Sequence, residues 1–370
     1  MLRVLASGAR DGGWRRLRHV WASNMSTVFR KRERATRLPP LLQMAMGSWV
    51  SQALYTAAKL RIADALSDGP QSCEAIAAAT GTTAHSLSRL LRALCSLRVI
   101  AAAEDGRFML TALGRPLQAE GPGSLRAMVL TLGEIHDDAW GALTDCIRTG
   151  APAFPQVFGA RLFDHLDRNR DAGHTFHEAM TNLAALISQA VLLVYDFAGI
   201  QILVDVGGGY GQFLTDILTV YPEMRGILVD TPAVIGEAKT HLEGRPSGPR
   251  CTLVPGSLLE PLPRGGNLYL LSGVIHDWDD DDAIKILDHC RRAMAPDGKV
   301  LVVETILPAE DESAFGALLD LNMLVMTGGR ERTECEFRRL FDAAGLVVTR
   351  ITPTLAPQWT IEGSCQRSGR

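Results

Sequence analysis

From Ile202 onward, short apolar runs alternate with helical patterns, and this alternation constrains the fold more than any other feature of the chain. Strands separated by helices are typical of an α/β domain with a parallel sheet. The expected strands are residues 202–206, 226–230, 251–254, 268–273 and 300–305. Two later runs, 346–351 and 359–362, lie on either side of a segment with two prolines and predict a closing antiparallel pair.

The chain has 370 residues, which favours more than one domain. Ahead of the α/β region, residues 74–80 predict a short helix, and a turn follows. Leu87, Leu91 and Leu94 then recur at the spacing of an amphipathic helix. Residues 99–110 carry a hairpin signal around a central Gly106. Helix, turn, helix and hairpin together predict a winged helix.

We therefore expect four segments along the chain. Residues 1–40 are Arg-rich and predict a disordered extension, although an organelle transit peptide fits the same composition. Residues 41–115 form the winged-helix domain, and 116–200 a helical linker that contributes to a substrate pocket. Residues 201–370 form the α/β domain.

Winged helices often bind DNA, and Arg89, Arg92 and Arg98 lie on or beside the second helix. Nearby acids nearly balance them, and the whole chain carries a net charge of −3. A role in dimerisation or in covering a substrate is therefore favoured, and a DNA-binding regulator that senses a small molecule remains an alternative.

Neither a membrane protein nor a cysteine-based metal protein is expected. The longest uncharged apolar stretch, 179–195, contains polar residues and is short for a membrane span. The seven cysteines are scattered, without a C-x-x-C pair. This distribution fits a reducing compartment and predicts a cytoplasmic protein.

A glycine-rich loop follows the first expected strand of the α/β domain, where Gly207-Gly208-Gly209-Tyr210-Gly211 precedes a helical pattern. Glycines at such a turn let the backbone approach a ligand closely. Asp230 ends the next strand, where a carboxylate can accept hydrogen bonds from an adenosine ribose. The pair suits NAD and S-adenosylmethionine equally, and Asp230 could alternatively cap the helix that starts near Pro232.

His276-Asp277-Trp278 follows the strand 268–273, at the edge of the sheet where open α/β folds bind their ligands. The acids that come next, Asp279 to Asp282, are interpreted as helix capping. No metal site is predicted.

Four segments now match a family: residues 205–211, Asp230, 276–278 and 328–333. Together they resemble the S-adenosylmethionine-dependent O-methyltransferases of the plant caffeate and animal hydroxyindole type. They look most similar to the bacterial members that decorate aromatic natural products, as in antibiotic biosynthesis. The resemblance covers about residues 41–365. It implies a Rossmann-like class I methyltransferase domain and a winged-helix domain that builds an intertwined homodimer.

The resemblance also implies roles for single residues. His276 matches the catalytic base, with Glu304 and Glu331 as the acids beside it. The residues expected at the cofactor are Asp205, Gly207, Gly209, Asp230, Ser257, Leu258 and Ser272. Those expected at the substrate are Phe176, Met180, Asp277, Asn322, Met323 and Met326. Ser257 stands where the family usually has Asp, and Ser272 where many members have Lys or Arg, so both weaken the match to the cofactor site.

The sequence thus predicts a dimeric, cytoplasmic O-methyltransferase that uses S-adenosylmethionine and acts on an aromatic hydroxyl of a small secondary metabolite. It predicts no nucleic-acid or membrane partner. One alternative within the same fold is N-methylation, and another is hydroxylation or decarboxylation without methyl transfer.

Overall fold

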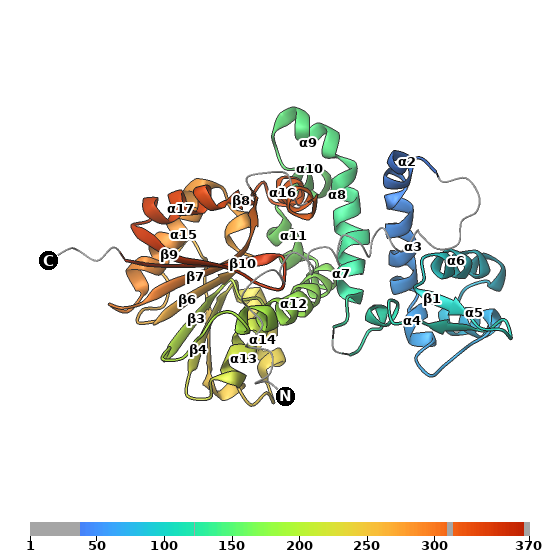
Figure 1. Cartoon of the computed structure of the whole chain (residues 1–370), viewed down its shortest axis with the longest axis horizontal. Helices are drawn as coiled ribbons and strands as arrows, with labels where there is room; N and C mark the ends of the chain where they lie inside the picture. The colour runs from blue at the N-terminus through green and yellow to red at the C-terminus, as the bar shows by residue number, and fades with distance from the viewer. Residues whose placement is uncertain (1–37, 122, 309–313, 366–370) are drawn as a thin grey trace, which may run out of the picture. The chain divides into compact units, whose positions relative to one another are not determined.

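A computed structural model describes residues 38–121, 123–308 and 314–365. The chain divides into two compact units, one up to Gly121 and one from Pro122 onward (Figure 1). The division falls a few residues after the predicted end of the first domain at 115. Most of the expected N-terminal extension, residues 1–37, lies outside the described residues.

The first unit contains the helix, turn, helix and hairpin that the sequence predicts. Ser72 caps the first of these helices through its side chain, and the second buries Leu87, Leu91 and Leu94. The elements are α2 (Pro40–Ala45), α3 (Gly47–Lys59), α4 (Ile62–Ala65), α5 (Cys73–Thr80), α6 (Ala84–Ser96), β1 (Ile100–Ala102), β2 (Phe108–Leu110) and η1 (Arg115–Leu117).

The second unit begins with helices. They are α7 (Arg126–Thr131), the π-helix η2 (Leu132–His136), α8 (Asp137–Gly141), α9 (Leu143–Thr149), α10 (Ala153–Phe158), α11 (Leu162–Arg168) and α12 (Arg170–Leu192). The apolar stretch 179–195 forms the end of α12, where Ile187 and Val191 pack against the α/β core. Within the described part of the chain, no helix is both long and apolar enough to span a membrane.

An eight-stranded sheet follows, in the order β5-β4-β3-β6-β7-β10-β9, with β8 paired to β7. The strands are β3 (Ile202–Val206), β4 (Arg225–Asp230), β5 (Cys251–Pro255), β6 (Leu268–Ser272), β7 (Lys299–Leu307), β8 (Arg332–Thr333), β9 (Leu346–Pro353) and β10 (Gln358–Cys365). Strand β10 pairs antiparallel with both β7 and β9, so the expected closing pair is confirmed.

Helices cover both faces of this sheet (Figure 1). The helical elements that follow β3 in the chain are α13 (Gln212–Val220), α14 (Pro232–Leu242), η3 (Gly248–Arg250), η4 (Ile275–Asp277), α15 (Asp280–Ala293), α16 (Ala314–Met326) and α17 (Glu334–Ala343). The chain passes from β3 to β4 on one side and returns to β6 on the other. Ligands of open α/β sheets bind at such a reversal, beyond the carboxyl ends of the strands. The glycine loop follows β3 and His276 follows β6, so the fold places both at this edge.

Candidate active site

The glycine loop leaves β3 in a conformation that favours glycine. Gly207 has φ of 71° and Gly209 has φ of 58°, both in the left-handed region. A Cβ on Gly207 would lie 2.9 Å from Val274 and 3.3 Å from Leu258, whereas a Cβ on Gly209 would meet nothing within 4 Å. The loop is therefore packed beneath Gly207 and open at Gly209.

The Asp230 carboxylate lies against this loop. One oxygen accepts a hydrogen bond from the Gly209 N–H at 2.8 Å, and the other accepts one from the Thr231 N–H at 2.7 Å. Burial raises the pKa of Asp230 to about 6, although these two hydrogen bonds oppose the shift. Thr231 caps α14 with its own side chain, so Asp230 is not the N-cap. Each carboxylate oxygen keeps a lone pair for a further donor.

Asp205 lies beneath the loop. Its side chain is 1% exposed, and one of its oxygens has no hydrogen-bond partner. A Cβ on Gly208 would collide with that oxygen. Burial, followed by the nearby charge of Asp230, raises the pKa of Asp205 to about 7. Its predicted contact with the cofactor stays a prediction, since this position supports the loop from within.

The other residues predicted at the cofactor lie on neighbouring segments. Leu258 lies beside Gly207, where an added Cβ would be 3.3 Å from its side chain. Ser257 is exposed after β5, and its hydroxyl accepts a hydrogen bond from the Leu259 N–H at 3.2 Å. Ser272 is the last residue of β6, the strand next to β3.

His276 lies in the short helix η4, between two buried acids. Its Nδ1 atom is 2.7 Å from Glu331 Oε1 and 3.3 Å from Glu304 Oε2. The structure thus brings together the three residues that the sequence predicts as catalytic. One imidazole nitrogen and one carboxylate oxygen from each acid lie within 4.8 Å of one another. Atoms at this spacing could also coordinate a metal ion. The expected absence of a metal therefore stays a prediction.

These contacts fix the protonation of the imidazole. A carboxylate only accepts hydrogen bonds, so Nδ1 carries the proton that Glu331 accepts. Burial by itself lowers the pKa of His276, but the charge of Glu304 and the hydrogen bond to Glu331 raise it to about 10. Burial also raises the pKa of Glu304, and the charge of His276 opposes this shift. The other ring nitrogen, Nε2, faces Gly273, where an added Cβ would lie 3.8 Å away.

The segment from Gly329 to Arg332 holds the turn that carries His276. The buried Arg332 guanidinium donates to the carbonyls of Ile275 at 3.0 Å and Trp278 at 2.8 Å, and pairs with Asp280. The Arg330 N–H donates to the His276 carbonyl at 2.8 Å. A Cβ on Gly329 would collide with that same carbonyl. Arg332 lies in the 328–333 segment, but no role was predicted for it from the sequence.

An apolar cluster formed by the helices from η2 to α12 together with α16 contains several residues predicted at the substrate. Phe176 and Met326 are buried in it, and Met180 and Trp140 pack against it. Asn322, also on α16, accepts hydrogen bonds from Trp140 Nε1 at 2.9 Å and from His136 Nδ1 at 3.1 Å. Met323 is buried outside this cluster. Asp277 lies next to His276, and burial raises its pKa to about 6.

Family models match both units of the chain. The model described as the O-methyltransferase domain matches residues 140–347. The chain belongs to the O-methyltransferase family. The model of the O-methyltransferase dimerisation domain matches residues 42–119.

Three relatives of this O-methyltransferase illustrate the range of chemistry. The phenazine O-methyltransferase PhzM of Lysobacter antibioticus is 42% identical over 85% of this chain and 92% of its own. The phenazine-1-carboxylate N-methyltransferase of Pseudomonas aeruginosa is 34% identical over 84% of this chain and 92% of its own. The structure of human N-acetylserotonin methyltransferase in complex with SAM has a TM-score of 0.84 at 27% identity, covering 90% and 99% of the two chains.

The O-methyltransferase uses S-adenosylmethionine as its cofactor, and the loop residues fit this molecule. Gly209 presents backbone without a side chain, and Asp230 retains lone pairs for hydroxyl donors.

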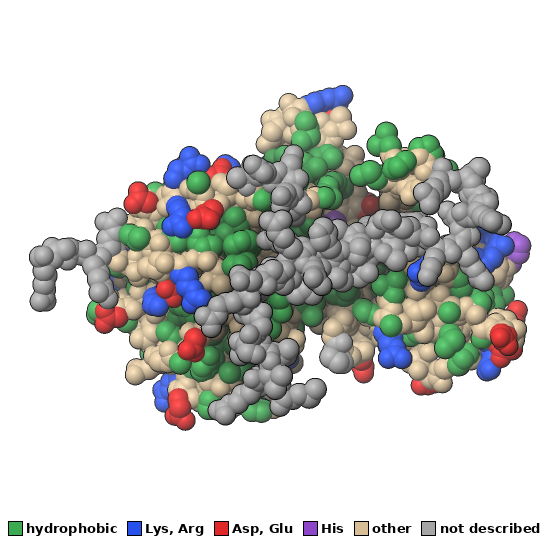
Figure 2. Space-filling view, viewed as in Figure 1, with side chains coloured by type: hydrophobic (Ala, Val, Ile, Leu, Met, Phe, Trp, Pro, Cys, Tyr) green, Lys and Arg blue, Asp and Glu red, His purple; other side chains and the backbone are tan. Residues whose placement is uncertain are grey.

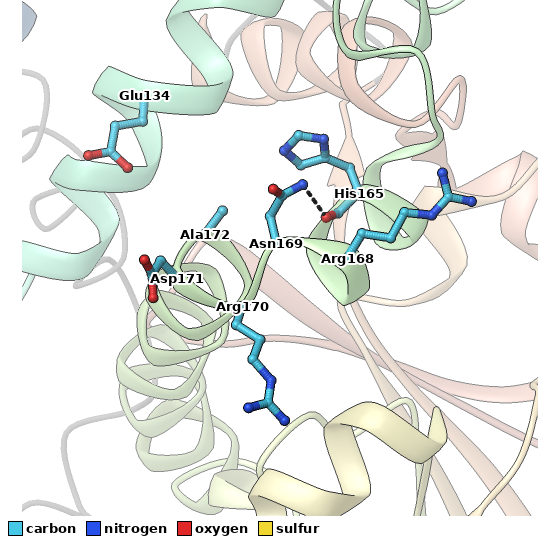
Figure 3. A pocket seen from close by; sticks show the side chains of 7 residues that line it. All are labelled: Glu134, His165, Arg168, Asn169, Arg170, Asp171 and Ala172. Carbon is cyan, nitrogen blue, oxygen red and sulfur yellow. Dashed lines mark hydrogen bonds between the residues drawn. The ribbon is translucent and has the colours of Figure 1, made fainter.

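A polar hollow of about 450 Å³ lies where α11 meets α12 (Figure 3). Its lining includes Glu134, His165, Arg168 and Arg170, none of which was predicted at the site. The two arginines point in different directions, and the Asn169 side chain donates to the His165 carbonyl at 3.0 Å. The hollow offers no convergent set of charges, so we assign no chemistry to it.

Two residues near Asn322 were missed by the sequence analysis, namely His136 and Trp140. His136 lies 186 residues before Asn322, and no motif connects the two. The spacing of His136 and Trp140 places them on one face of a helix, but the sequence does not show which partner that face meets.

Proposed function

We propose that this O-methyltransferase transfers a methyl group to a phenolic hydroxyl of a small aromatic acceptor, with His276 as the general base. One observation carries the proposal. The Nδ1–H of His276 is held by Glu331 while Nε2 faces the side-chain-free position of Gly273. An imidazole arranged in this way can accept a proton at Nε2 from a bound hydroxyl.

Bound S-adenosylmethionine supplies an electrophilic methyl group on a sulfonium. The open backbone at Gly209 would lie along it, and Asp230 would accept hydrogen bonds from its ribose hydroxyls. Leu258 would add an apolar contact beside Gly207. By holding the cofactor, these residues would align the acceptor oxygen, the methyl carbon and the sulfur for transfer.

A phenol is a weak nucleophile until it loses its proton, and its pKa is about 10. The charge of Glu304 and the hydrogen bond to Glu331 outweigh burial and raise the pKa of His276, which moves it toward that of the phenol and favours proton transfer. Glu331 and Glu304 then stabilise the imidazolium that forms.

The acceptor would lie in the apolar cluster beside α16. Phe176, Met180 and Met326 provide aromatic and flexible side chains that suit a flat ring. Two relatives, a 3-amino-4-hydroxybenzoate 4-O-methyltransferase and a 2,7-dihydroxy-5-methyl-1-naphthoate 7-O-methyltransferase, are named for aromatic hydroxy acids, which supports an aromatic acceptor.

We further propose that the protein works as a homodimer in the cytoplasm. The match of residues 42–119 to a dimerisation domain supports the dimer and a non-DNA role for the winged helix. On the face shown in Figure 2, basic and acidic side chains of the described residues are interspersed, which does not favour a DNA-binding surface.

Methyl-labelled S-adenosylmethionine and a panel of phenols and aryl amines test the proposal. We expect label on oxygen, and a loss of about 10²- to 10⁴-fold in turnover for His276→Ala with unchanged cofactor affinity. Label on nitrogen alone would instead support the N-methyltransferase alternative. Tight cofactor binding with no labelled product would indicate chemistry without methyl transfer.

A further inference from the structure

Asn322 is held by two hydrogen-bond donors on the same oxygen. Trp140 Nε1 lies 2.9 Å and His136 Nδ1 lies 3.1 Å from Asn322 Oδ1. An indole N–H can only donate, so the atom that faces Trp140 must be the carbonyl oxygen of the amide. The orientation of the carboxamide is therefore settled by chemistry.

The same oxygen also fixes the tautomer of His136. Because an amide oxygen only accepts, Nδ1 of His136 must carry a proton. Burial lowers the pKa of His136 to about 4, although the Asn322 bond opposes the shift, so the ring is neutral near pH 7. Both donors are thus neutral groups that stay in place over the working pH range.

A π-helix brings these two donors together. The π-helix η2 ends at His136, between α7 and α8, and Figure 1 shows α7 and α8 as one continuous run. His136 and Trp140 are four residues apart and so lie on one face of that run. Single π turns inside α-helices occur frequently at functional sites.

The amino group of Asn322 is left for another partner. With Oδ1 occupied by Trp140 and His136, Nδ2 projects from the opposite side of the amide, and among the described residues nothing accepts a hydrogen bond from it. Asn322 is half-buried, and Trp140 packs against the same apolar cluster as Phe176 and Met326.

The helix that carries Asn322 is anchored to the catalytic segment at two points. Asp320, two residues earlier, accepts a hydrogen bond from the Glu331 N–H at 2.8 Å. Thr327, directly after the helix, accepts a hydrogen bond from the Gly329 N–H at 3.1 Å, and Gly329 lies directly against the His276 carbonyl. These contacts therefore fix the position of Asn322 relative to the turn that carries His276.

We propose that His136 and Trp140 are positioning residues that point the Asn322 amino group at the acceptor, and that the acceptor carries a hydrogen-bond-accepting group on its ring system besides the methylated hydroxyl. A ring nitrogen or a carbonyl would serve. The inference rests on the proposed function, since it concerns the substrate of the same site. A site that donates to such a group rejects an analogue without it, because the buried donor is then left unpaired.

A matched pair of probes tests this preference. 1-Hydroxyphenazine and 1-hydroxyanthracene have the same shape, but only the first has ring nitrogens. We expect the enzyme loaded with S-adenosylhomocysteine to bind 1-hydroxyphenazine about 10- to 100-fold more tightly. The ratio of kcat/KM with S-adenosylmethionine should show the same preference.

Variants then test the positioning role. The double variant Trp140→Phe with His136→Phe removes both donors and should lower the preference at least tenfold, with the affinity for S-adenosylhomocysteine unchanged. His136→Gln keeps an N–H donor and should retain most of the preference. In an Asn322→Ala background, the double substitution should have no further effect on the preference. Trp359→Phe, in β10, is the control for loss of an indole elsewhere.

A double variant that melts like the wild type and keeps the full preference would overturn the inference. If that variant fails to fold, Asn322→Asp decides, because its carboxylate still accepts from both donors but has no amino group. An unchanged preference in Asn322→Asp would likewise overturn it. Wild-type enzyme that binds neither probe, or methylates both equally, contradicts the inference and leaves the proposed function standing. Selective binding of 1-hydroxyphenazine without methyl transfer would contradict the proposed function alone.

Discussion

The Nδ1 atom of His276 lies 2.7 Å from Oε1 of Glu331, in a site where both side chains are largely withdrawn from water. This contact does two things at once. It fixes the proton on Nδ1, which leaves Nε2 as the basic atom, and it helps to raise the pKa of the ring. The rate of the reaction should therefore depend on pH through His276.

Replacing Glu331 with Gln should move that pH dependence. The amide still accepts from Nδ1 but carries no charge, so the pKa of His276 falls from its value of about 10. His276 must be neutral at Nε2 to act as a base, so kcat/KM rises with pH through this pKa. In the variant, the rise should occur at lower pH, and the plateau should be about 10²-fold lower because the imidazolium is less stabilised.

A pH series of kcat/KM at saturating S-adenosylmethionine measures this shift. Glu334→Gln, an exposed acid paired with Arg338, is the matched control and should leave the profile unchanged. If Glu331→Gln leaves the position of the rise unaltered, Glu331 does not set the pKa of the base.

Loss of the Asp230 carboxylate should weaken cofactor binding. Asp230→Asn keeps an oxygen that can accept from the Gly209 N–H, so the loop should hold its shape. The charge that would accept from the ribose is lost, and charge-assisted hydrogen bonds contribute about 1.5–3 kcal/mol. Titration calorimetry should show about a 10- to 100-fold weaker affinity for S-adenosylhomocysteine. Asp281→Asn, at an exposed position, is the control and should bind S-adenosylhomocysteine like the wild type. Equal affinities in the wild type and both variants would mean that Asp230 does not contact the cofactor.

Arg332 should matter for both stability and turnover. Its buried guanidinium satisfies two carbonyls of the turn around His276, and Lys cannot reach both in the same geometry. We expect Arg332→Lys to lower the free energy of unfolding by about 2–4 kcal/mol, because buried carbonyls lose their donors. Turnover should fall while cofactor affinity holds. Arg338→Lys, an exposed control, should change stability by less than about 0.5 kcal/mol. A normal turnover in Arg332→Lys would show that the turn keeps its shape without the guanidinium.

The sequence predicted those helices and strands whose residue pattern is local to the element. The strand 202–206 is an apolar run that ends in a glycine loop, and the structure has that strand at Ile202–Val206. His276 was singled out because it follows a strand, and its predicted role as a base came from the family resemblance. The order of the strands and the burial of Asp205 under Gly208 were not readable, since both depend on packing between distant segments. The contact of His136 with Asn322 joins positions 186 residues apart, and no local pattern encodes it.

The open space at Gly209 predicts that a side chain at this position weakens cofactor binding. Its φ of 58° makes any L-residue strained, at a cost of about 1–2 kcal/mol, and an added Cβ would project into a volume with no protein atom within 4 Å. Gly244 has φ of 77° and an equally open Cβ position, but it follows α14, outside the glycine loop. Gly209→Ala and Gly244→Ala should therefore lose similar stability in thermal melts. Only Gly209→Ala should also lose affinity for S-adenosylhomocysteine, by at least tenfold, because its methyl group occupies the space where the cofactor would lie. Equal affinities in the two variants would mean that the cofactor does not pass over Gly209.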